Sequence, residues 1–186
     1  MLGLIYPTLL FVHILSALAL FAVEGLDLFA MRELRAAKEE GAAHAALARL
    51  SLAQKLVGPV PPLLLLSGLG LCALTWGFQT PWVDLSLLGF VTIAVLVRVV
   101  DTPRLARLQA LMRDGATFGH LHAAMYDPAL RRGSRVRLGL LVWLVGLMTV
   151  KPGWVIALVA LLPVLAWTLL SPPRPAPLAV SQPNTT

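Results

Sequence analysis

The chain has 186 residues, of which 58% are hydrophobic and 13% are charged, and its mean hydropathy is +0.82. A soluble domain of this length cannot bury so much apolar surface, so the composition excludes an ordinary soluble enzyme and is typical of an integral membrane protein. The net charge of +6 does not indicate a nucleic-acid partner, because the basic residues flank apolar stretches. We therefore expect the lipid bilayer as the partner of this chain, and no nucleic acid.

Five apolar stretches predict membrane-spanning helices, since about 20 residues of helix cross a hydrocarbon core of about 30 Å. No Lys or Arg precedes the first stretch and no small-x-small cleavage pattern closes it, so we interpret it as an uncleaved span. The fourth stretch is short, so we expect Arg137 to extend it and to reach back to the lipid headgroups. The sequence thus predicts an all-α polytopic bundle over residues 1–170, with spans at about 2–30, 59–78, 82–100, 136–150 and 154–170.

The segments between these spans carry most of the charge. Residues 31–58 are expected to be helical extensions of the first two spans. In the loop 101–135, Thr102 and Pro103 are typical of a helix start and predict a short amphipathic helix along the membrane surface, with Leu105, Leu108 and Met112 on one face. Residues 171–186 are rich in proline and have little to bury, which predicts a disordered tail.

The distribution of Lys and Arg predicts the orientation. With five spans, 14 of the 15 basic residues fall on one side of the membrane, and Lys151 alone falls on the other. Because cytoplasmic loops carry the excess of Lys and Arg, the N-terminus is predicted outside and the C-terminus in the cytoplasm. Aromatic residues at the predicted outer interface favour the same register: Tyr6, Trp76, Trp82 and Trp154.

The first span carries three polar residues on one helical face. At 100° per residue, His13, Glu24 and Asp27 lie close to one line along the helix. Titratable groups inside a membrane face the protein interior, so we expect this face to point into the bundle. Arg98, at the cytoplasmic end of the third span, lies at a similar depth and is the expected partner of both carboxylates.

Each of these residues has a structural and a functional interpretation. His13 lies near the predicted midplane, where an imidazole ligates a haem iron or copper, relays a proton, or simply hydrogen-bonds a neighbouring helix. Glu24 and Asp27 either pin two helices together through Arg98 or form a proton or cation path toward His13. The single cysteine, Cys72, and the absence of a zinc signature predict no dedicated metal site in the chain.

Two motifs carry a family resemblance. The early helix with a mid-membrane histidine, LLFVHILSALALFAVEGLDLFAMRELR, and the hydrophobic-Lys-Pro turn, LMTVKPGW, resemble a group of small bacterial membrane proteins. That group includes HemJ-type protoporphyrinogen oxidases, CopD-like copper-resistance proteins and several uncharacterised families. The resemblance implies a helical bundle in the bacterial inner membrane that binds haem b, with His13 as an axial ligand and Lys151 as a functional residue. The tryptophan and glycine that follow the histidine in HemJ-type members are replaced here by Ala17, Leu18, Ala19 and Leu20, which favours an uncharacterised member.

Three functions stay open on the sequence. The first is a bundle that binds haem or porphyrin through His13, and the second is a non-catalytic subunit or scaffold that associates with other membrane subunits or with itself. The third is a HemJ-like oxidase or a copper-handling protein, and the scattered methionines count against copper. Whether the chain is an enzyme is therefore left open at this stage.

Overall fold

The computed structural model describes residues 2–37, 39–115, 120 and 124–170, and every regular element in these ranges is helical. The expected disordered tail, 171–186, lies outside the described residues, as do Lys38 and Arg174. In chain order, the elements are α1 (Leu2–Ala36), α2 (Glu40–Val57), α3 (Val60–Leu71), the π-helical turn η1 (Cys72–Trp76), α4 (Pro81–Leu96), the π-helical turn η2 (Val97–Asp101), α5 (Thr102–Arg113), α7 (Pro128–Val150) and α8 (Trp154–Leu170).

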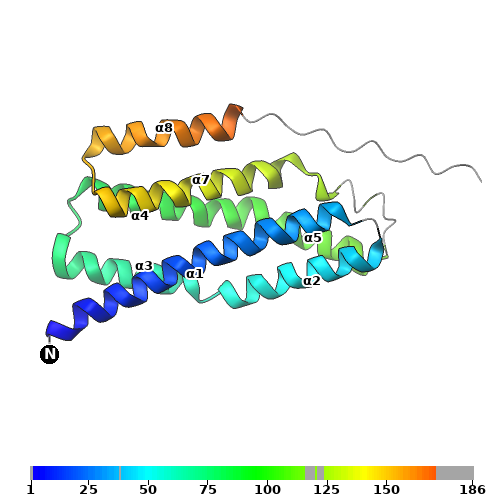
Figure 1. The fold of residues 1–186 in the computed structure, drawn as a ribbon, viewed down its shortest axis with the longest axis horizontal. Helices are drawn as coiled ribbons and strands as arrows, with labels where there is room; N and C mark the ends of the chain where they lie inside the picture. The colour runs from blue at the N-terminus through cyan, green and yellow to red at the C-terminus, as the bar shows by residue number, and fades with distance from the viewer. Residues whose placement is uncertain (1, 38, 116–119, 121–123, 171–186) are drawn as a thin grey trace, which may run out of the picture.

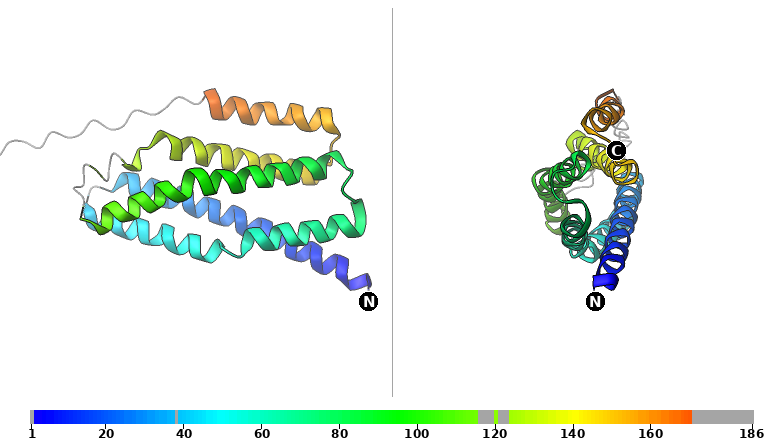
Figure 2. Two further views of the ribbon diagram at one scale, coloured as in Figure 1. Left: turned by 180° about the vertical axis from the view of Figure 1, so that it is seen from behind. Right: turned by 90° about the vertical axis from the view of Figure 1, so that its left-hand side faces the viewer.

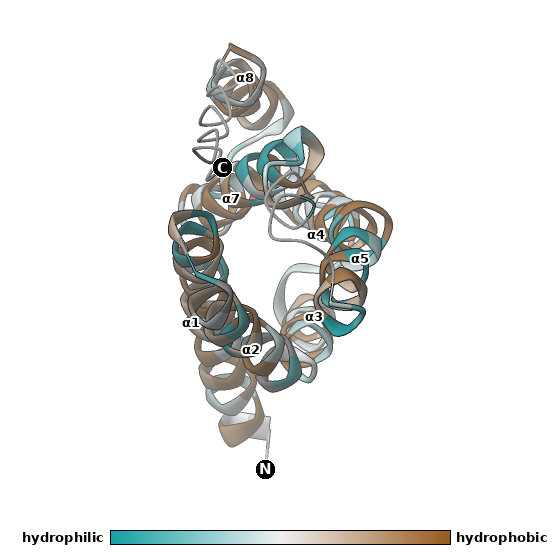
Figure 3. Ribbon diagram, turned by 90° about the vertical axis from the view of Figure 1, so that its right-hand side faces the viewer, coloured by the Kyte–Doolittle hydropathy of each residue, from teal (hydrophilic) through white to brown (hydrophobic). Residues whose placement is uncertain are grey.

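The helices run roughly parallel to one long axis (Figures 1 and 2). Helix α1 packs on α2 and α3, α4 packs on α7, and α7 packs on α8. Seen along the long axis, α1, α2, α3, α5, α4 and α7 follow one another around a ring, and α8 lies outside it against α7 (Figure 3). The ring explains why the polar positions of several helices can meet inside the bundle.

Three helices are long and apolar enough to cross a membrane. They are Gly3–Ala36, the continuous helix Pro81–Arg113, and Pro128–Val150. Two shorter apolar helices, Val60–Trp76 and Trp154–Thr168, stand beside them. The all-helical fold predicted from the sequence is therefore confirmed, together with three helices capable of crossing a membrane.

Two apolar clusters hold the helices together. One joins α1, α2 and α5 at the end of the bundle where α1 finishes, with Leu34, Leu50 and Leu108 fully buried. The other joins α4, α7 and α8 around Trp143 and Leu147. The indole nitrogen of Trp143 also donates a 3.0 Å hydrogen bond to the carbonyl of Ala157, which fixes α8 on α7.

The expected helix break at Thr102 is wrong. The turn η2 carries α4 directly into α5, and the Thr102 hydroxyl donates to the carbonyl of Val97 instead of capping a new helix. A π-helical turn inserts a residue without ending the helix, and no sequence pattern signals it. Leu105, Leu108 and Met112 do share one face, and this face is buried in the bundle against α1 and α2.

Candidate functional site

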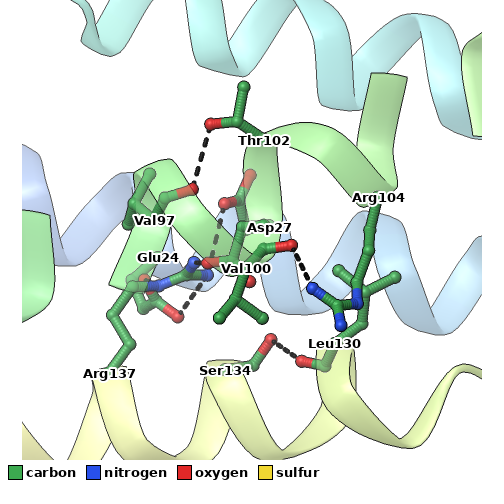
Figure 4. A network of polar contacts seen from close by, with 10 residues as sticks. Glu24, Asp27, Val97, Val100, Thr102, Arg104, Leu130, Ser134 and Arg137 are labelled. Atoms are coloured by element: carbon green, nitrogen blue, oxygen red, sulfur yellow. Dashed lines mark hydrogen bonds and ion pairs between the residues drawn. The ribbon is translucent and has the colours of Figure 1, made fainter. Parts of the chain in front are cut away.

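The most densely charged point inside the bundle is Arg137 of α7. Its Nε donates to Oε2 of Glu24 at 2.6 Å and its Nη2 donates to Oε1 of the same carboxylate at 3.0 Å, which is a bidentate pair. Its Nη1 donates to Oδ2 of Asp101. The second acidic residue of α1, Asp27, lies 3.5 Å from Nη2 through its Oδ2. Three carboxylates from two helices therefore surround one guanidinium, and we call these four residues the ion-pair cluster (Figure 4).

The backbone brings the cluster together in three ways. Glu24 and Asp27 are three residues apart on α1 and so share a face. The turn η2 ends at Asp101 and directs it toward α7. Gly133 lets α7 approach η2, because a Cβ at this position would lie 3.0 Å from Oδ1 of Asp101.

Burial makes the cluster energetically important. Glu24, Asp101 and Arg137 are 5%, 4% and 7% exposed, so their charged groups are almost completely shielded from solvent. Buried charges are tolerated only when they are paired and hydrogen-bonded. Two buried oxygens, Oδ1 of Asp27 and Oδ1 of Asp101, have no hydrogen-bond partner among the described residues. The cluster thus keeps unused acceptor capacity inside the bundle.

A cavity of about 580 Å³ lies against the cluster. It lies between α1, the junction of α2 and α3, the continuous helix α4–η2–α5, and α7. Five charged residues line it, and the rest of the lining is mainly apolar: Glu24, Asp27, Arg98, Asp101 and Arg137. This volume is within the range of about 300–1,000 Å³ typical of small-molecule sites.

The structure changes the partner expected for the two carboxylates of α1. Glu24 and Asp27 do share an inward face, but Arg137 makes their ion pairs and Arg98 does not take that role. Arg98 instead lines the same cavity from an exposed position in η2. Arg137 does not reach back toward headgroups, because α7 begins at Pro128 and places residue 137 well inside the helix.

His13 lies at the contact of α1 with α3 and outside the cavity lining. Its Nδ1 is 3.1 Å from the carbonyl oxygen of Leu64 and 3.2 Å from Oγ of Ser67. The Ser67 hydroxyl donates to the Leu63 carbonyl at 2.6 Å, so its oxygen accepts from Nδ1. Nδ1 therefore carries the proton of the neutral ring, and the lone pair lies on Nε2.

Lys151 lies at the end of α7, with a positive φ of 50°, and its N–H donates to the carbonyl of Leu147. Its Nζ is 4.6 Å from the ring centroid of Trp76 and 5.7 Å from that of Trp82. Tyr6 packs edge-on against Trp76, and Trp76 packs edge-on against Trp82, so three of the four aromatic residues expected at one interface are in contact. Lys151 lies at the C-terminal end of the helix that carries Arg137, and its described contacts are with aromatic rings.

Asp101 and Arg137 are the site residues that sequence reasoning missed. The sequence feature that could have identified them is a charged residue within or next to an apolar helix, because an unpaired charge in that position is costly. Arg137 stands at the edge of a long apolar run and Asp101 follows another, so both looked like flanking residues. Within the ranges that the structure describes, no group of three or more His, Cys, Asp or Glu side chains is arranged to hold a metal ion.

The fold and the site define the class: a helical bundle with helices able to cross a membrane and a buried ion-pair cluster beside a cavity. No protein-family model, no curated protein and no solved structure matches the chain.

Proposed function

We propose that the chain is a multi-pass protein of the bacterial inner membrane with five spans, its N-terminus outside and its C-terminus in the cytoplasm. The two shorter apolar helices, α3 with η1 and α8, supply the spans beyond the three long ones. Helix α8 supports this proposal because its large apolar side chains are exposed on several sides, as they are in a helix surrounded by lipid. The N-terminus and the turns η1–α4 and α7–α8 lie at one end of the bundle, which is the pattern that five spans require (Figure 1).

Within that bundle, the function that the geometry supports best is the binding of a small cationic ligand in the central cavity. The observation that carries this proposal is the charge balance of the lining. Three carboxylates face two arginines, so the lining has one unit of negative charge in excess. The carboxylates of Glu24, Asp27 and Asp101, which line the cavity, are the groups that would attract a bound cation.

A purely structural cluster would not be expected to have this composition. Two carboxylates on one arginine would satisfy its five N–H donors, whereas a third buried carboxylate adds a desolvation cost. Charges kept inside a membrane at such a cost commonly mark ion or substrate sites. The cluster therefore serves binding as well as helix packing.

The test is a titration of the purified protein with butylamine as the probe, followed by the midpoint of thermal unfolding. A ligand that binds the folded state raises the midpoint in proportion to the logarithm of its concentration. We expect a rise for the wild type and less than half of that rise for Asp27→Asn, which removes the charge and keeps the shape. Glu33→Gln, on the same helix in an exposed pair with Arg49, is the matched control and should respond as the wild type does. Equal midpoints with and without butylamine in the wild type would overturn the proposal.

Haem or porphyrin binding through His13 is a second candidate, and one specific observation favours it. Metal-bound histidines usually donate their other ring N–H to a carbonyl or a carboxylate. The same arrangement occurs in His13, where Nδ1 contacts the Leu64 carbonyl and the lone pair that an axial ligand needs lies on Nε2. Haem held there would supply one-electron chemistry, as the resemblance to HemJ-type oxidases implies.

An absorption spectrum of the purified protein, oxidised and dithionite-reduced, tests this second candidate. We expect a Soret band in the wild type that is lost in His13→Ala and kept in His44→Ala, which changes a histidine of α2 outside the bundle interior. A colourless protein from haem-replete cells would contradict haem binding. The alternative of a non-catalytic subunit would then be tested by co-purification with membrane partners.

A further inference from the structure

Four arginines lie near one end of the bundle, on two helices that the ion-pair cluster joins. The pair of Glu24 with Arg137 fixes α1 and α7 side by side. Beyond this pair, α1 ends at Ala36 and α7 begins at Pro128, and each helix carries two arginines about one turn apart there. We call these four residues the basic seam: Arg32, Arg35, Arg131 and Arg135.

Arg35 is held in the basic seam by the segment that precedes α7. Its Nε donates a 3.2 Å hydrogen bond to the carbonyl of Met125, and the hydroxyl of Tyr126 donates to the Arg35 carbonyl at 3.4 Å. The positive charges of Arg35 and Arg131 are close enough to repel each other. The fold therefore holds two like charges side by side, an arrangement that an anion bound to both would stabilise.

Two carboxylates that are close to the basic seam in sequence are paired with arginines outside it. Glu33 of α1 pairs with Arg49 of α2 at 2.5 Å. Asp127, which precedes α7, pairs with Arg104 of α5 at 3.0 Å. The seam therefore presents a positively charged surface at the end of the bundle opposite the α7–α8 turn (Figure 1).

The outward face of α7 continues from the basic seam as an apolar strip. At about 100° per residue, Leu138, Val142 and Val145 fall within about 80° of the two arginines of α7. Val142 is 57% exposed and Val145 is 45% exposed. Arg137 turns toward α1 on one side of this strip, and Gly139 meets α8 on the other side. The strip therefore lies between α1 and α8, which stand on either side of α7 (Figure 3).

A positive end and an apolar strip on one surface match the chemistry of an anionic phospholipid. Guanidinium groups bind phosphate oxygens through parallel N–H···O bonds. Apolar side chains exposed in a bilayer contact acyl chains. Basic surfaces between membrane helices on the cytoplasmic side are typical sites for anionic head groups. A free phosphate ion would use the seam alone, whereas a lipid uses the seam and the strip together.

We propose that the outward face of α7 binds an anionic phospholipid, with its phosphate at the basic seam and an acyl chain along Leu138, Val142 and Val145. This inference rests on the proposed location of the bundle in a membrane, and the proposed orientation assigns the lipid to the cytoplasmic leaflet. It does not depend on the proposed cation site. It adds a second ligand class, bound on the outside of the ring of helices.

The test follows the unfolding midpoint of the full chain in a mild non-ionic detergent while a probe is added, which gives a dissociation constant. The probes are dioleoylphosphatidylglycerol, dioleoylphosphatidylcholine and inorganic phosphate. We expect the phosphatidylglycerol to bind about tenfold more tightly than the phosphatidylcholine, which has the same chains and no net charge. We expect inorganic phosphate to bind more weakly than the phosphatidylglycerol by a similar factor, because it has no acyl chain for the strip.

Paired variants separate the seam from a general attraction to positive charge. Arg35→Gln with Arg131→Gln should weaken phosphatidylglycerol binding about tenfold. The matched control is Arg107→Gln with Arg113→Gln, which removes the same charge from exposed positions of α5 and should stay within twofold of the wild type.

A second seam variant covers the case in which the first one does not fold. Arg32→Gln with Arg135→Gln leaves the hydrogen bond between Arg35 and Met125 in place and should weaken phosphatidylglycerol binding about fivefold. Within the strip, Val142→Gln should weaken phosphatidylglycerol binding about threefold and leave the response to inorganic phosphate unchanged.

The outcomes distinguish the lipid site from its alternatives. Equal affinities of the two lipids would overturn the proposal, and so would equal losses in the seam variants and in the α5 control. Inorganic phosphate that binds as tightly as the phosphatidylglycerol would indicate a site for a free anion and would overturn the lipid assignment.

The membrane location is tested separately by washing cell membranes with alkaline carbonate. Release of the chain without detergent would overturn that location and the lipid site with it. A chain that stays in the membrane but binds both lipids equally would overturn the lipid site alone.

Discussion

At the scale of single residues, Arg137 is the position on which the cluster depends most. Removing one partner of a buried ion pair costs about 3–5 kcal/mol, because the charges left behind stay buried without compensation. We therefore expect Arg137→Ala to lower the free energy of unfolding by that amount, measured by denaturant unfolding in mild detergent. Arg98→Ala is the control and should change it by less than about 1 kcal/mol, since Arg98 is exposed. A larger effect of Arg98→Ala than of Arg137→Ala would contradict the assignment of the ion pairs.

We expect the protein to fold without the charges of the cluster, provided that all four residues are replaced together. Apolar residues of similar volume often substitute for buried ion pairs without loss of stability. A variant with Glu24→Leu, Asp27→Leu, Asp101→Leu and Arg137→Met should recover most of the stability that Arg137→Ala loses, in the same unfolding experiment. The effects are not additive because the four side chains are in contact. A combined variant less stable than Arg137→Ala would show that the charges themselves are needed for the fold.

Lys151 contributes through its aromatic neighbours. Exposed cation–π contacts stabilise by about 0.5–1 kcal/mol, so Lys151→Ala should lower the free energy of unfolding by about that amount, and Lys151→Arg should preserve it. The tryptophan fluorescence of the folded protein provides an independent readout, because the ammonium lies over the ring of Trp76. Unchanged stability and fluorescence in Lys151→Ala would argue against a stabilising contact.

Sequence reasoning at this scale found half of the cluster. Glu24 and Asp27 were predicted to face inward because helical periodicity within one helix determines which residues share a face. The identity of their partner depends on which helices are neighbours, and periodicity does not contain that information. Depth along the spans pointed to Arg98, whereas the contact of α7 with α1 and η2 brings Arg137 to the carboxylates.

At the scale of helices, the contact of α7 with α8 depends on a glycine. A Cβ on Gly139 would lie 2.6 Å from Cγ1 of Val164, a branched side chain with little rotamer freedom. We expect Gly139→Ala to cost about 1–3 kcal/mol of stability, as over-packed sites do. Gly146→Ala in the same helix meets no atom within 4 Å and should be neutral or stabilising by about 0.5–1 kcal/mol, since alanine favours helix. Thermal unfolding of the two variants side by side checks both, and equal midpoints would contradict the tight contact.

The helix starts and ends show what local sequence can and cannot predict. Asp127 and Pro128 are residue types common in turns, and in this chain they form the start of α7, with Oδ1 of Asp127 accepting from the N–H of Ala129 at 2.8 Å. The two π-helical turns have no counterpart in the sequence pattern. Each one places a residue of interest, Asp101 in η2 and Trp76 in η1, against a charged partner from another helix. Insertions of this kind are stabilised by tertiary contacts and become visible only in the folded chain.

At the scale of the whole molecule, composition alone predicted the class, because apolar surface in this proportion requires a surrounding apolar phase. The ring of helices and the cavity inside it depend on long-range packing, which no single helix encodes. The helices expected in residues 31–58 are present as the end of α1 and as α2. Helix α2 is separated from α3 by a turn at residues 58–59, so it does not extend the second apolar stretch as one continuous helix. The orientation in the membrane is a prediction made from the distribution of Lys and Arg.

Reporter fusions test that orientation and the five spans together. The basic residues of α1, α2, α5 and the first half of α7 gather at the end of the bundle opposite the α7–α8 turn, and an excess of Lys and Arg marks the cytoplasmic side. Fusions after Glu40 and after Gly115 should therefore give fluorescence with a cytoplasmic reporter, and a fusion after Gly153 should give activity with a periplasmic phosphatase. The same reporters exchanged between positions are the control and should be silent. Cytoplasmic fluorescence from position 153 would refute the five-span arrangement, because α7 would then not have carried the chain across the membrane.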